Sequence, residues 1–411
     1  MVDDSTKLTR PLLIYVPEMA AYGGMEQHVC NAAEYCAGGG TTVTMMTTSR
    51  SLSAKRRARL LASGVDFVEM NVERGRSSGL RKLIWIVTRL VARSGRWQSV
   101  YTNGQSGLVK TVAGICRRRG AMQLAHHHHT SADEREVANW TELYRKVLAE
   151  TKCLVGCSKT TRRNLAKATG RDDVAFLPYI TSPIVSRESI QGRKSFGGTV
   201  RIGYFGRLVS TKGIDTICAL SAEPRLRGVL WEIYGKGEGY SADFFAPHKN
   251  VRYNGAYRGL REYAEALRRI DGVVLLSEHN EGMPLSLIEA MAANCTWIAS
   301  DQGGVKELVA EGSRAVVVPH GASFADILET VVRFVGSLSE GGSRPAQERN
   351  LYDSFLLPET VGILWGQFLT CGRTSERSSV GQEGSTGLDR RTSNHGASAA
   401  DADGVRSDSG S

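Results

Sequence analysis

The sequence lacks several features that would assign it to a class at once. No apolar run in its 411 residues approaches the roughly 20 residues that a membrane-spanning helix needs. The first residues, MVDDSTKLTR, contain no apolar signal core, so we expect that the protein is not exported. Its 8 cysteines are scattered, and Cys153 and Cys157 do not have a usual zinc or redox spacing. We therefore expect reduced thiols, as in the cytoplasm.

The sequence also lacks a recognisable nucleic-acid-binding motif, although it is basic. Its formal net charge is +10, and residues 1–120 hold 18 Lys and Arg against 8 Asp and Glu. Such an excess predicts an anionic partner, which is a membrane surface, a phosphorylated acceptor or a nucleic acid. Because no motif supports the last of these, we expect no nucleic acid.

The length and the pattern of the chain predict two domains. A chain of 411 residues is longer than one hydrophobic core usually organises. Strand and helix patterns alternate in both halves, which predicts two parallel-sheet α/β domains. We expect a flexible N-terminus at 1–10, a first domain at 11–182, a linker at 183–198, a second domain at 199–344, terminal helices at 345–370 and a tail at 371–411. The tail is rich in Gly, Ser, Arg and Asp and should be disordered.

The first half opens with an apolar run at 11–16 that is typical of a buried strand. Gly23 and Gly24 follow, and an amphipathic helix comes next. Bare backbone N–H groups at a helix N-terminus can bind phosphate, but an ordinary turn between a strand and a helix has the same pattern. Further strands are predicted at 41–48, 99–102, 122–125, 153–157 and 174–178.

Residues 80–97 have helical spacing and two different faces. The apolar stripe consists of Leu80, Leu83, Ile84, Val87, Leu90 and Val91, and the basic stripe of Lys82, Arg89, Arg93 and Arg96. Two interpretations remain open. The helix packs on the core as an ordinary surface helix, or it docks on an anionic membrane leaflet together with the basic cluster at 117–119.

Four consecutive histidines, at 126–129, follow the strand predicted at 122–125. A metal site would need their side chains to converge on one ion. Successive side chains of a strand point to opposite faces, so these four cannot all do so, and we expect no metal there.

Candidate residues of the second half begin after a strand at 200–205. Gly206 and Arg207 come first, and Lys212 follows in the same loop. An Arg fork and a Lys point charge at a strand end can neutralise a departing nucleoside diphosphate without a metal ion. Two surface cations in a loop would give the same pattern. A strand at 229–234 then leads into Gly235 and Gly237, a glycine turn that carries little information alone.

The stretch at 277–309 contains two carboxylates, Glu281 and Glu289. An apolar strand precedes it at 273–276, and Pro284 is suited to open a helix because its missing N–H costs nothing there. Glu281 should therefore lie in the loop after a strand, and Glu289 inside the following helix. Ligands bind at this end of parallel sheets, so we interpret both as site residues rather than as solvated charges. We expect a tight turn at Gly303 and a second helix from 305.

This stretch resembles the signature of the family 4 nucleotide-sugar glycosyltransferases. The matching residues are Glu281, Gly282, Pro284, Leu285, Glu289, Ala290, Met291, Ala292, Asp301, Gly303, Gly304, Glu307, Leu308 and Val309. The segment at 206–215 and the Gly-Gly-x-Glu at 23–26 are similar to further motifs of the family. Tyr179 and Ile180 replace the family's Asn-Gly, and Asn294 replaces a Gly. Asn tolerates positive φ, so a helix C-cap at 294 remains consistent with the pattern.

The resemblance implies the GT-B fold, in which two Rossmann-like parallel-sheet domains face each other across a cleft and terminal helices often cross back to the first domain. It implies a retaining hexosyltransferase that binds a nucleoside-diphosphate sugar mainly on the second domain and the acceptor on the first. The implied donor-binding residues are Gly23, Gly24, Gly206, Arg207, Lys212, Gly235, Gly237, Glu281, Gly282, Met283, Pro284, Leu285 and Glu289. We expect no metal and no other cofactor.

The resemblance also implies a role for each candidate catalytic residue. Arg207 and Lys212 would hold the leaving diphosphate, and Glu281 would lie beside the donor sugar, while Glu289 would bind the ribose hydroxyls. One of His128 and His129 would help to hold the sugar, and the sequence does not choose between them.

The positive charge of the first domain indicates an anionic acceptor or membrane surface. We expect a glycan or a polyprenyl-diphosphate-linked glycan, and a cytoplasmic protein that is peripheral on the inner face of the membrane, as bacterial surface polysaccharide synthesis requires. A soluble acceptor is an alternative. A nucleotide-sugar 2-epimerase and a sugar phosphorylase on the same fold also stay open. A basic nucleic-acid-binding protein would explain the charge of residues 1–120 but not the pattern at 281–307.

Overall fold

The computed structural model describes residues 11–19, 23–50, 52–73, 75, 77–93, 97–182, 199–339 and 347–371. The predicted N-terminus at 1–10, the predicted linker at 183–198 and residues 372–411 of the predicted tail lie outside these ranges. No helix within them has the length and apolar character that crossing a bilayer requires. The seven cysteines whose side chains are described are free thiols.

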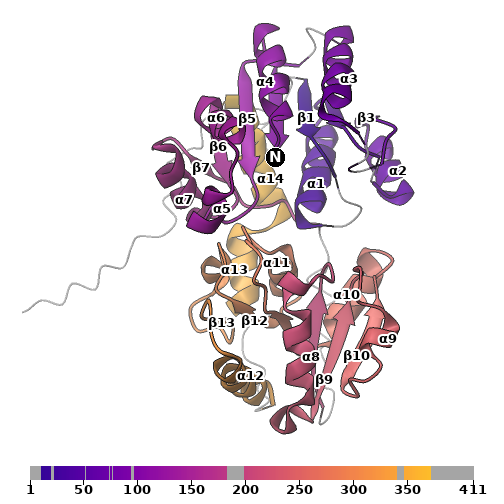
Figure 1. The fold of residues 1–411 in the computed structure, drawn as a ribbon, viewed down its shortest axis with the longest axis vertical. Coiled ribbons are helices and arrows are strands. Elements are labelled where there is room, and N and C mark those ends of the chain that lie inside the picture. Colours follow the sequence, from indigo (N-terminus) through magenta and orange to yellow (C-terminus); the bar gives the residue numbers. More distant parts are fainter. Residues whose placement is uncertain are drawn as a thin grey trace, which may run out of the picture. The chain divides into compact units, whose positions relative to one another are not determined.

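The first sheet is parallel and has the strand order β3-β2-β1-β4-β5-β6-β7 (Figure 1). Its strands are β1 (Leu12–Val16), β2 (Val43–Thr47), β3 (Asp66–Glu69), β4 (Ser99–Asn103), β5 (Gln123–His128), β6 (Cys153–Gly156) and β7 (Ala175–Phe176). Every residue of β1 is buried, as expected for a central parallel strand covered on both faces.

Helices cover both faces of the first sheet. They are α1 (Gly24–Gly38), α2 (Ala54–Ala62), α3 (Gly79–Ala92), α4 (Leu108–Arg118), α5 (Glu134–Ala138), α6 (Glu142–Glu150) and α7 (Lys159–Thr169). Leu12 and Ile14 of β1 pack in one core with α1 and α2, whereas Leu13 and Tyr15 pack in another with α3, α4 and α6. The alternation of side chains along β1 thus supplies both cores.

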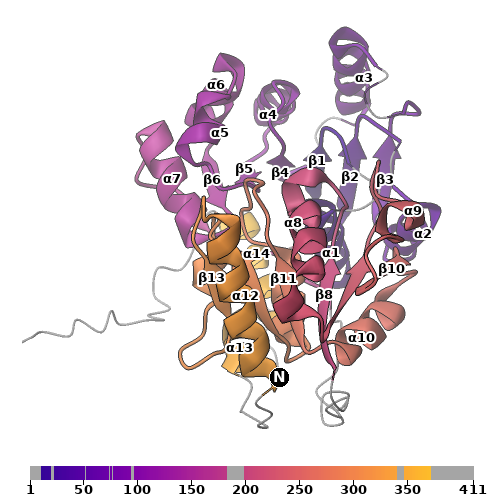
Figure 2. The same cartoon turned by 60° about the horizontal axis from the view of Figure 1, so that its bottom comes forward.

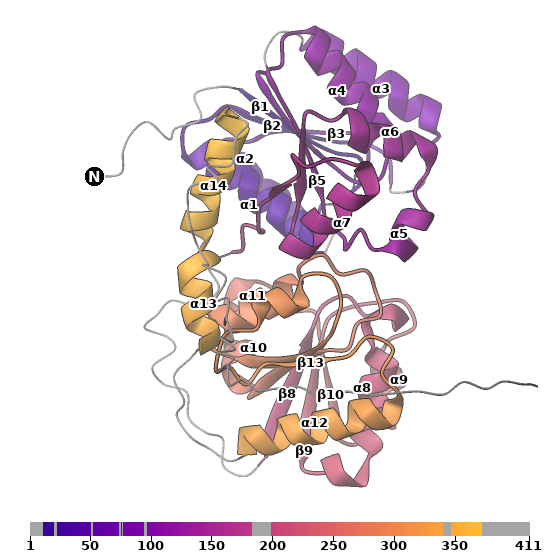
Figure 3. The same cartoon turned by 90° about the vertical axis from the view of Figure 1, so that its left-hand side faces the viewer.

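The second sheet is also parallel, with the order β10-β9-β8-β11-β12-β13. Its strands are β8 (Val200–Phe205), β9 (Val229–Tyr234), β10 (Val251–Gly255), β11 (Gly272–Leu275), β12 (Thr296–Ser300) and β13 (Val316–Val318). Figure 2 shows α8 (Ile214–Ala222) and α12 (Phe324–Ser339) in front of β8 and β11. Figure 3 shows α11 (Leu285–Ala292) on the opposite face of the sheet from α12. The remaining elements here are α9 (Ala242–Phe245), α10 (Leu260–Arg269) and the 3-10 turns η3 (Ser210–Lys212), η4 (Pro224–Leu226) and η5 (Val305–Leu308).

The two terminal helices pack against different sheets. On α13 (Gln347–Phe355), Arg349 Nη1 donates to Ala292 O at the end of α11, at 2.6 Å. On α14 (Pro358–Cys371), Trp365 is buried in the core of the first sheet, and its Nε1 donates to Pro178 O at 2.9 Å. The chain therefore returns to its first sheet after completing its second, as Figure 3 shows.

The strands predicted from apolar runs are all present, but several helical details differ. The sequence patterns did not reveal α2 and β3. Strand β5 continues through the histidine run to His128 instead of ending at residue 125. The helix expected from residue 305 is only the 3-10 turn η5. The C-cap of α11 is Ala293 and not Asn294, but Asn294 follows it with a φ of 55°, the positive value that an Asn tolerates.

For residues 80–97 the structure does not support the interpretation in which the whole apolar stripe packs on the core, and it leaves the membrane-docking interpretation untested. Helix α3 ends at Ala92, and residues 94–96, which include the predicted Arg96, lie outside the described residues. Within the predicted apolar stripe Leu80, Ile84 and Val91 are 67%, 56% and 45% exposed, and the buried side chains of α3 are those of Ile86 and Leu90. In the predicted basic stripe Lys82 and Arg93 are ion-paired with Glu18 and Asp66.

Candidate active site

The loops after β8 and β11 meet at the carboxyl edge of the second sheet. Thr211 O accepts hydrogen bonds from Glu278 N at 2.8 Å and from His279 N at 3.2 Å. Gly213 has a φ of 73°, and a Cβ there would lie 2.2 Å from Leu276 O. Only glycine permits this close approach, so the two loops are held together by their backbones.

Lys212 and Glu281 form an ion pair across these two loops. Their side chains are only 13% and 11% exposed, so water screens the pair weakly. Ser277 Oγ donates to the same Glu281 oxygen, Oε1, at 2.8 Å. The fold thus brings together two predicted site residues that are 69 positions apart in the sequence.

Arg207 lies in the turn after β8, and its side chain is exposed. Tyr204 Oη donates to the carbonyl oxygen of Arg207 at 2.7 Å and fixes the turn. Burial raises the pKa of the Tyr204 hydroxyl, the charge of Glu281 raises it further, and the charge of Arg207 lowers it. Arg207 thus lies in the same loop as Lys212, and its charge and that of Glu281 both act on the Tyr204 hydroxyl.

Gly235 and Gly237 make room for the turn that follows β8. A Cβ at Gly235 would lie 1.9 Å from Gly206 O, and a Cβ at Gly237 would lie 1.6 Å from Leu208 O. Leu208 N also donates to Lys236 O at 3.0 Å, so the two turns lie against each other. The glycines at 235 and 237 are therefore required by backbone packing, independently of any ligand.

Glu289 lies on α11 and is 8% exposed. Tyr263 Oη on α10 donates to Glu289 Oε2 at 2.7 Å. Burial raises the pKa of Glu289 to about 7, although the hydrogen bond from Tyr263 lowers it. Such a carboxyl favours a bound proton or a further hydrogen-bond donor over the bare charge.

The segment between the two carboxylates lies against residues of the first sheet. Its predicted donor-binding residues Gly282, Met283, Pro284 and Leu285 are all buried. A Cβ at Gly282 would lie 2.4 Å from His129 O, which follows β5. A Cβ at Gly24 would lie 3.3 Å from Leu285 Cδ1. The predicted residues of both sheets therefore meet at this segment.

The carboxylate of Glu26 lies against the glycine turn that precedes α1. Gly23 is the N-cap of α1, and Gly24 is the first residue of the helix. A Cβ at Gly23 would lie 2.1 Å from Glu26 Oε2, so the Glu26 carboxylate covers the turn. A negative charge is favoured at a helix N-terminus, and a phosphate bound here would share the turn with Glu26.

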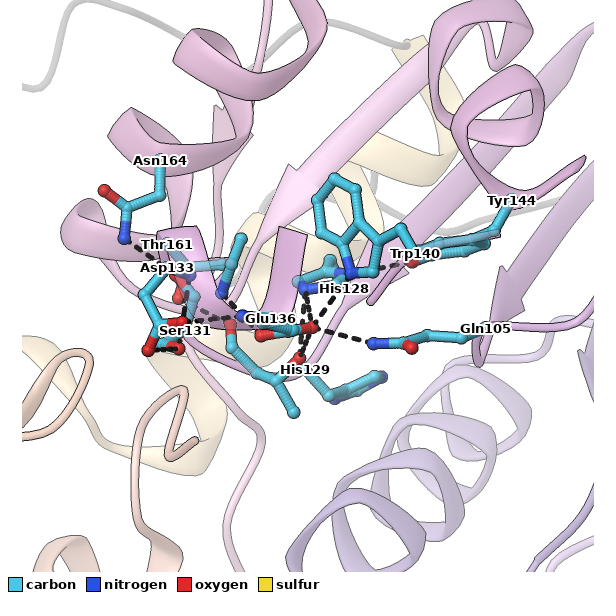
Figure 4. Close-up of polar contacts among 12 residues, drawn as sticks. Gln105, His128, His129, Ser131, Asp133, Glu136, Trp140, Tyr144, Thr161 and Asn164 are labelled. Carbon is cyan, nitrogen blue, oxygen red and sulfur yellow. Dashed lines mark hydrogen bonds and ion pairs between the residues drawn. The ribbon is translucent and has the colours of Figure 1, made fainter. Parts of the chain in front are cut away.

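His128 belongs to a set of polar contacts around Glu136, which Figure 4 shows. Its Nδ1 lies 2.8 Å from Tyr144 Oη, and its Nε2 lies 3.0 Å from Glu136 Oε1. Burial would raise the pKa of Glu136, but the interaction with His128 and hydrogen bonds from Thr130 and Ala132 hold it at about 2. Both ring nitrogens of His128 are thus occupied within the first sheet.

His129 has partners other than those of His128. Its Nδ1 lies 3.2 Å from Tyr179 Oη and its Nε2 lies 3.3 Å from Tyr101 Oη. The histidines alternate as expected for a strand, because His126 and His128 contact Tyr144 while His127 and His129 contact Tyr101. Within the described ranges, no three His, Cys, Asp or Glu side chains are grouped so that they could hold a metal ion.

Sequence reasoning missed Glu136, Tyr263 and His279. Burial and the charge of Lys212 lower the pKa of His279, whereas the charges of Glu281 and Glu136 raise it. The charges that act on the His279 side chain therefore come from residues of both sheets. For Glu136 the one signal was its position three residues after Asp133, a pattern that predicts a helix start and not a partner for His128.

Sequence comparison gives two findings. Residues 199–335 match the family model described as Glycosyl transferases group 1. A GDP-mannose-dependent alpha-mannosyltransferase of Mycobacterium tuberculosis (strain CDC 1551 / Oshkosh) is 27% identical over 224 residues, which are 54% of this chain and 53% of that protein. The chain therefore spans about half the length of this curated relative.

Comparison with solved structures shows the fold. HepE of Anabaena in complex with UDP has a TM-score of 0.67 and 16% identity, and the match covers 87% of this chain and 99% of that one. Sucrose-phosphate synthase of Thermosynechococcus elongatus has a TM-score of 0.68 and 16% identity, with 87% and 98% covered. These likenesses and the two parallel sheets confirm the predicted GT-B fold class.

Proposed function

We propose that the protein is a glycosyltransferase that moves a hexosyl group from a nucleoside-diphosphate sugar to a glycan or lipid-linked glycan with retention of configuration. The observation that carries this proposal is the Lys212–Glu281 pair at the edge of the second sheet, with Arg207 in the same loop as Lys212. These residues lie inside the segment that matches the family model. The names of the curated relative, which uses GDP-mannose, and of HepE with UDP support a nucleotide-sugar donor.

Arg207 and Lys212 supply the positive charge for the leaving diphosphate. Lys212 is paired with Glu281, and diphosphate oxygens would compete with that carboxylate for its Nζ. Arg207 is exposed and offers a planar fork of N–H donors. Two cations at the edge of the sheet stabilise charge that develops as the sugar–phosphate bond breaks.

The two carboxylates bind the hydroxyl-bearing parts of the donor. Glu289 is buried and already accepts a bond from Tyr263, so the ribose hydroxyls are suitable donors to its remaining acceptor positions. When the diphosphate draws Lys212 away, Glu281 becomes available to sugar hydroxyls or to the developing oxocarbenium charge. Both carboxylates must be held in place to make these contacts. The buried segment at 282–285, which lies between them in the chain, holds them in place.

We assign the sugar-holding role to His129 rather than to His128. The ring nitrogens of both histidines have partners, but the His128 side chain is 2% exposed and paired with Glu136, whereas His129 is half-buried. The backbone of His129 lies directly against Gly282, next to Glu281. In this assignment the buried His128–Glu136 pair fixes the end of β5, and His129 lies beside the segment at 281–285 that is proposed to bind the donor.

The chemical step needs no base from the protein. The bond between the anomeric carbon and the phosphate oxygen breaks, and the acceptor oxygen forms its bond on the same face of the sugar. The acceptor hydroxyl gives its proton to the departing phosphate oxygen. The protein stabilises the charge on the phosphate and holds the acceptor hydroxyl beside the leaving phosphate, which are the main sources of rate enhancement in such a site.

We place the acceptor on the cytoplasmic face of an anionic membrane, as bacterial surface polysaccharide synthesis requires. Leu80, Ile84 and Val91 form an exposed apolar stripe on α3. Arg81 and Arg89 are exposed on the same helix, and the neighbouring α4 ends in exposed basic residues at 117–119. An apolar stripe bordered by cations suits the interface of an anionic bilayer.

A thermal-shift screen of UDP-, GDP- and ADP-sugars, with and without a chelator, tests the proposal. We expect one nucleotide to raise the unfolding temperature, and the shift to be unchanged by the chelator. Turnover of that donor must then require an acceptor. Release of a 2-epimer without acceptor, or reaction with inorganic phosphate alone, would replace the proposal by an epimerase or a phosphorylase. Competition by polynucleotide would instead favour a nucleic-acid-binding protein.

A further inference from the structure

Glu307 belongs to the family signature but has no role in the chemistry described above. It lies on η5, which follows β12 of the second sheet. Its Oε2 accepts a hydrogen bond from Lys159 N at 2.8 Å, and its Oε1 accepts one from Thr160 N at 2.6 Å. Both amides belong to the first turn of α7, on the first sheet. A side chain of the second sheet thus caps a helix of the first.

The two bonds complete the capping of α7. The first amides of a helix have no partner within the helix. Ser158 Oγ accepts from Thr161 N at 2.9 Å, as a local N-cap, and Glu307 satisfies the two preceding amides. A carboxylate is also the side chain that the positive end of a helix dipole favours. Hydrogen bonds to a charged acceptor are stronger than those between neutral groups.

The same turn touches the backbone beside Glu281. Gly304 N donates to Gly282 O at 2.7 Å. Gly303 has a φ of 54°, and a Cβ there would lie 1.7 Å from Glu281 O. A Cβ at Gly304 would lie 2.5 Å from the Cβ of Ser158. The turn at 303–307 is therefore packed between the start of α7 and the segment that carries Glu281.

We infer that Glu307 is a positioning residue, which fixes the Glu281–Gly282 segment against the first sheet by capping α7. It acts through backbone amides and does not touch the Lys212–Glu281 pair. The link that Glu307 makes between the two sheets follows from its hydrogen bonds to Lys159 and Thr160. The expected effect of this link on sugar transfer rests on the proposed function. Since Arg207, Lys212 and Glu289, which make the proposed diphosphate and ribose contacts, all belong to the second sheet, losing the cap should impair sugar transfer more than nucleotide binding.

The test is Glu307→Gln, with Glu311→Gln as the matched control, because Glu311 is an exposed carboxylate a few residues later. The amide group of Gln offers one acceptor where the carboxylate offered two, and it carries no charge. The first measurement is hydrogen exchange at the Lys159 and Thr160 amides. We expect exchange at least roughly tenfold faster in Glu307→Gln and unchanged in Glu311→Gln.

The second measurement separates nucleotide binding from transfer. For Glu307→Gln we expect nucleoside-diphosphate affinity within roughly twofold of the original protein, and a kcat/KM roughly 10- to 100-fold lower, the range for one charge-assisted hydrogen bond. Unchanged amide exchange would overturn the inference, and so would a parallel loss of nucleotide affinity. If the original protein transfers no sugar, the proposed function fails, while the exchange measurement still decides whether Glu307 links the two sheets.

Discussion

Arg207 and Glu281 are the two residues whose replacement tests the proposed chemistry most directly. Each would act on charge that develops only as the sugar leaves, so its loss should lower kcat/KM without unfolding the protein. We expect Arg207→Ala and Glu281→Gln each to lose roughly 10²–10³ in kcat/KM. Arg227→Ala, which removes an exposed Arg at the end of η4, should leave kcat/KM unchanged. Near-normal turnover in either test variant would contradict the assignment.

The buried carboxyl of Glu289 leads to a prediction about pH. Its pKa of about 7 in the folded protein lies above the ordinary 4.5, so the folded state holds the proton more tightly than the unfolded state. Its contribution to stability is therefore fully present below pH 4.5 and is lost as the pH rises through 7. A shift of this size corresponds to roughly 3 kcal/mol.

Urea unfolding between about pH 5 and pH 8 measures this contribution. Glu289→Gln keeps the shape of the side chain and removes its titration. The free energy of unfolding of the original protein should fall relative to that of Glu289→Gln as the pH rises. Parallel pH dependences in the two proteins would show that Glu289 does not titrate in this range.

At the residue scale, the sequence could predict those site residues that follow a predicted strand and belong to a motif with the spacing of the family. Lys212 and Glu281 were found in this way, and the structure pairs them. Glu136 and Tyr263 could not be found, because their importance comes from partners brought by other elements, His128 for one and Glu289 for the other. No local pattern encodes such pairings.

At the scale of elements, helix α3 shows what periodicity leaves undecided. The apolar residues of α3 are distributed around most of its circumference, so more than one set of them has helical spacing. Packing against β1 and α4 selects Ile86 and Leu90 for the core. Leu80 and Ile84 are left exposed, although the sequence grouped them with Leu90. Buried parallel strands were predictable because each is a short continuous apolar run, whereas the very basic α2 gave no such signal.

The exposed stripe of α3 predicts binding to anionic vesicles. Leu80→Ser combined with Ile84→Ser should reduce sedimentation with phosphatidylglycerol vesicles, because it removes the apolar part of the surface. Raising the salt should weaken binding of the original protein, since each cation near the surface contributes roughly 1 kcal/mol. Leu260→Ser, at an exposed position on α10, is the control and should bind normally. Salt-independent binding, or none, would remove the membrane from the proposal.

At the scale of the whole molecule, the chain closes on itself through α14. This helix begins after α13, which packs on α11, and ends in the core of the first sheet. Ser99 Oγ on β4 donates to Leu369 O of α14 at 2.9 Å, which joins residues 270 positions apart. Terminal helices were predictable from the sequence at 345–370. The family resemblance implied that they cross back to the first domain, whereas the residue pattern alone does not say which sheet each helix covers.

Trp365 is the side chain that anchors α14, and replacing it tests this arrangement. It is 1% exposed, lies edge-on to Tyr101 and packs near the rings of His28 and His127. Trp365→Ala should lower the free energy of unfolding by roughly 3–5 kcal/mol, because it removes a large buried side chain and leaves a cavity. It also leaves Pro178 O without its donor.

The matched control is Ile363→Ala on the same helix, where the side chain is 39% exposed. We expect a change of less than roughly 0.5 kcal/mol there. Urea unfolding followed by tryptophan fluorescence and by circular dichroism measures both variants, and the dichroism signal remains informative when Trp365 is gone. Equal effects at the two positions would mean that α14 is not docked through Trp365. A large loss at Trp365 alone would show that the last helix of the chain is part of the first sheet's core.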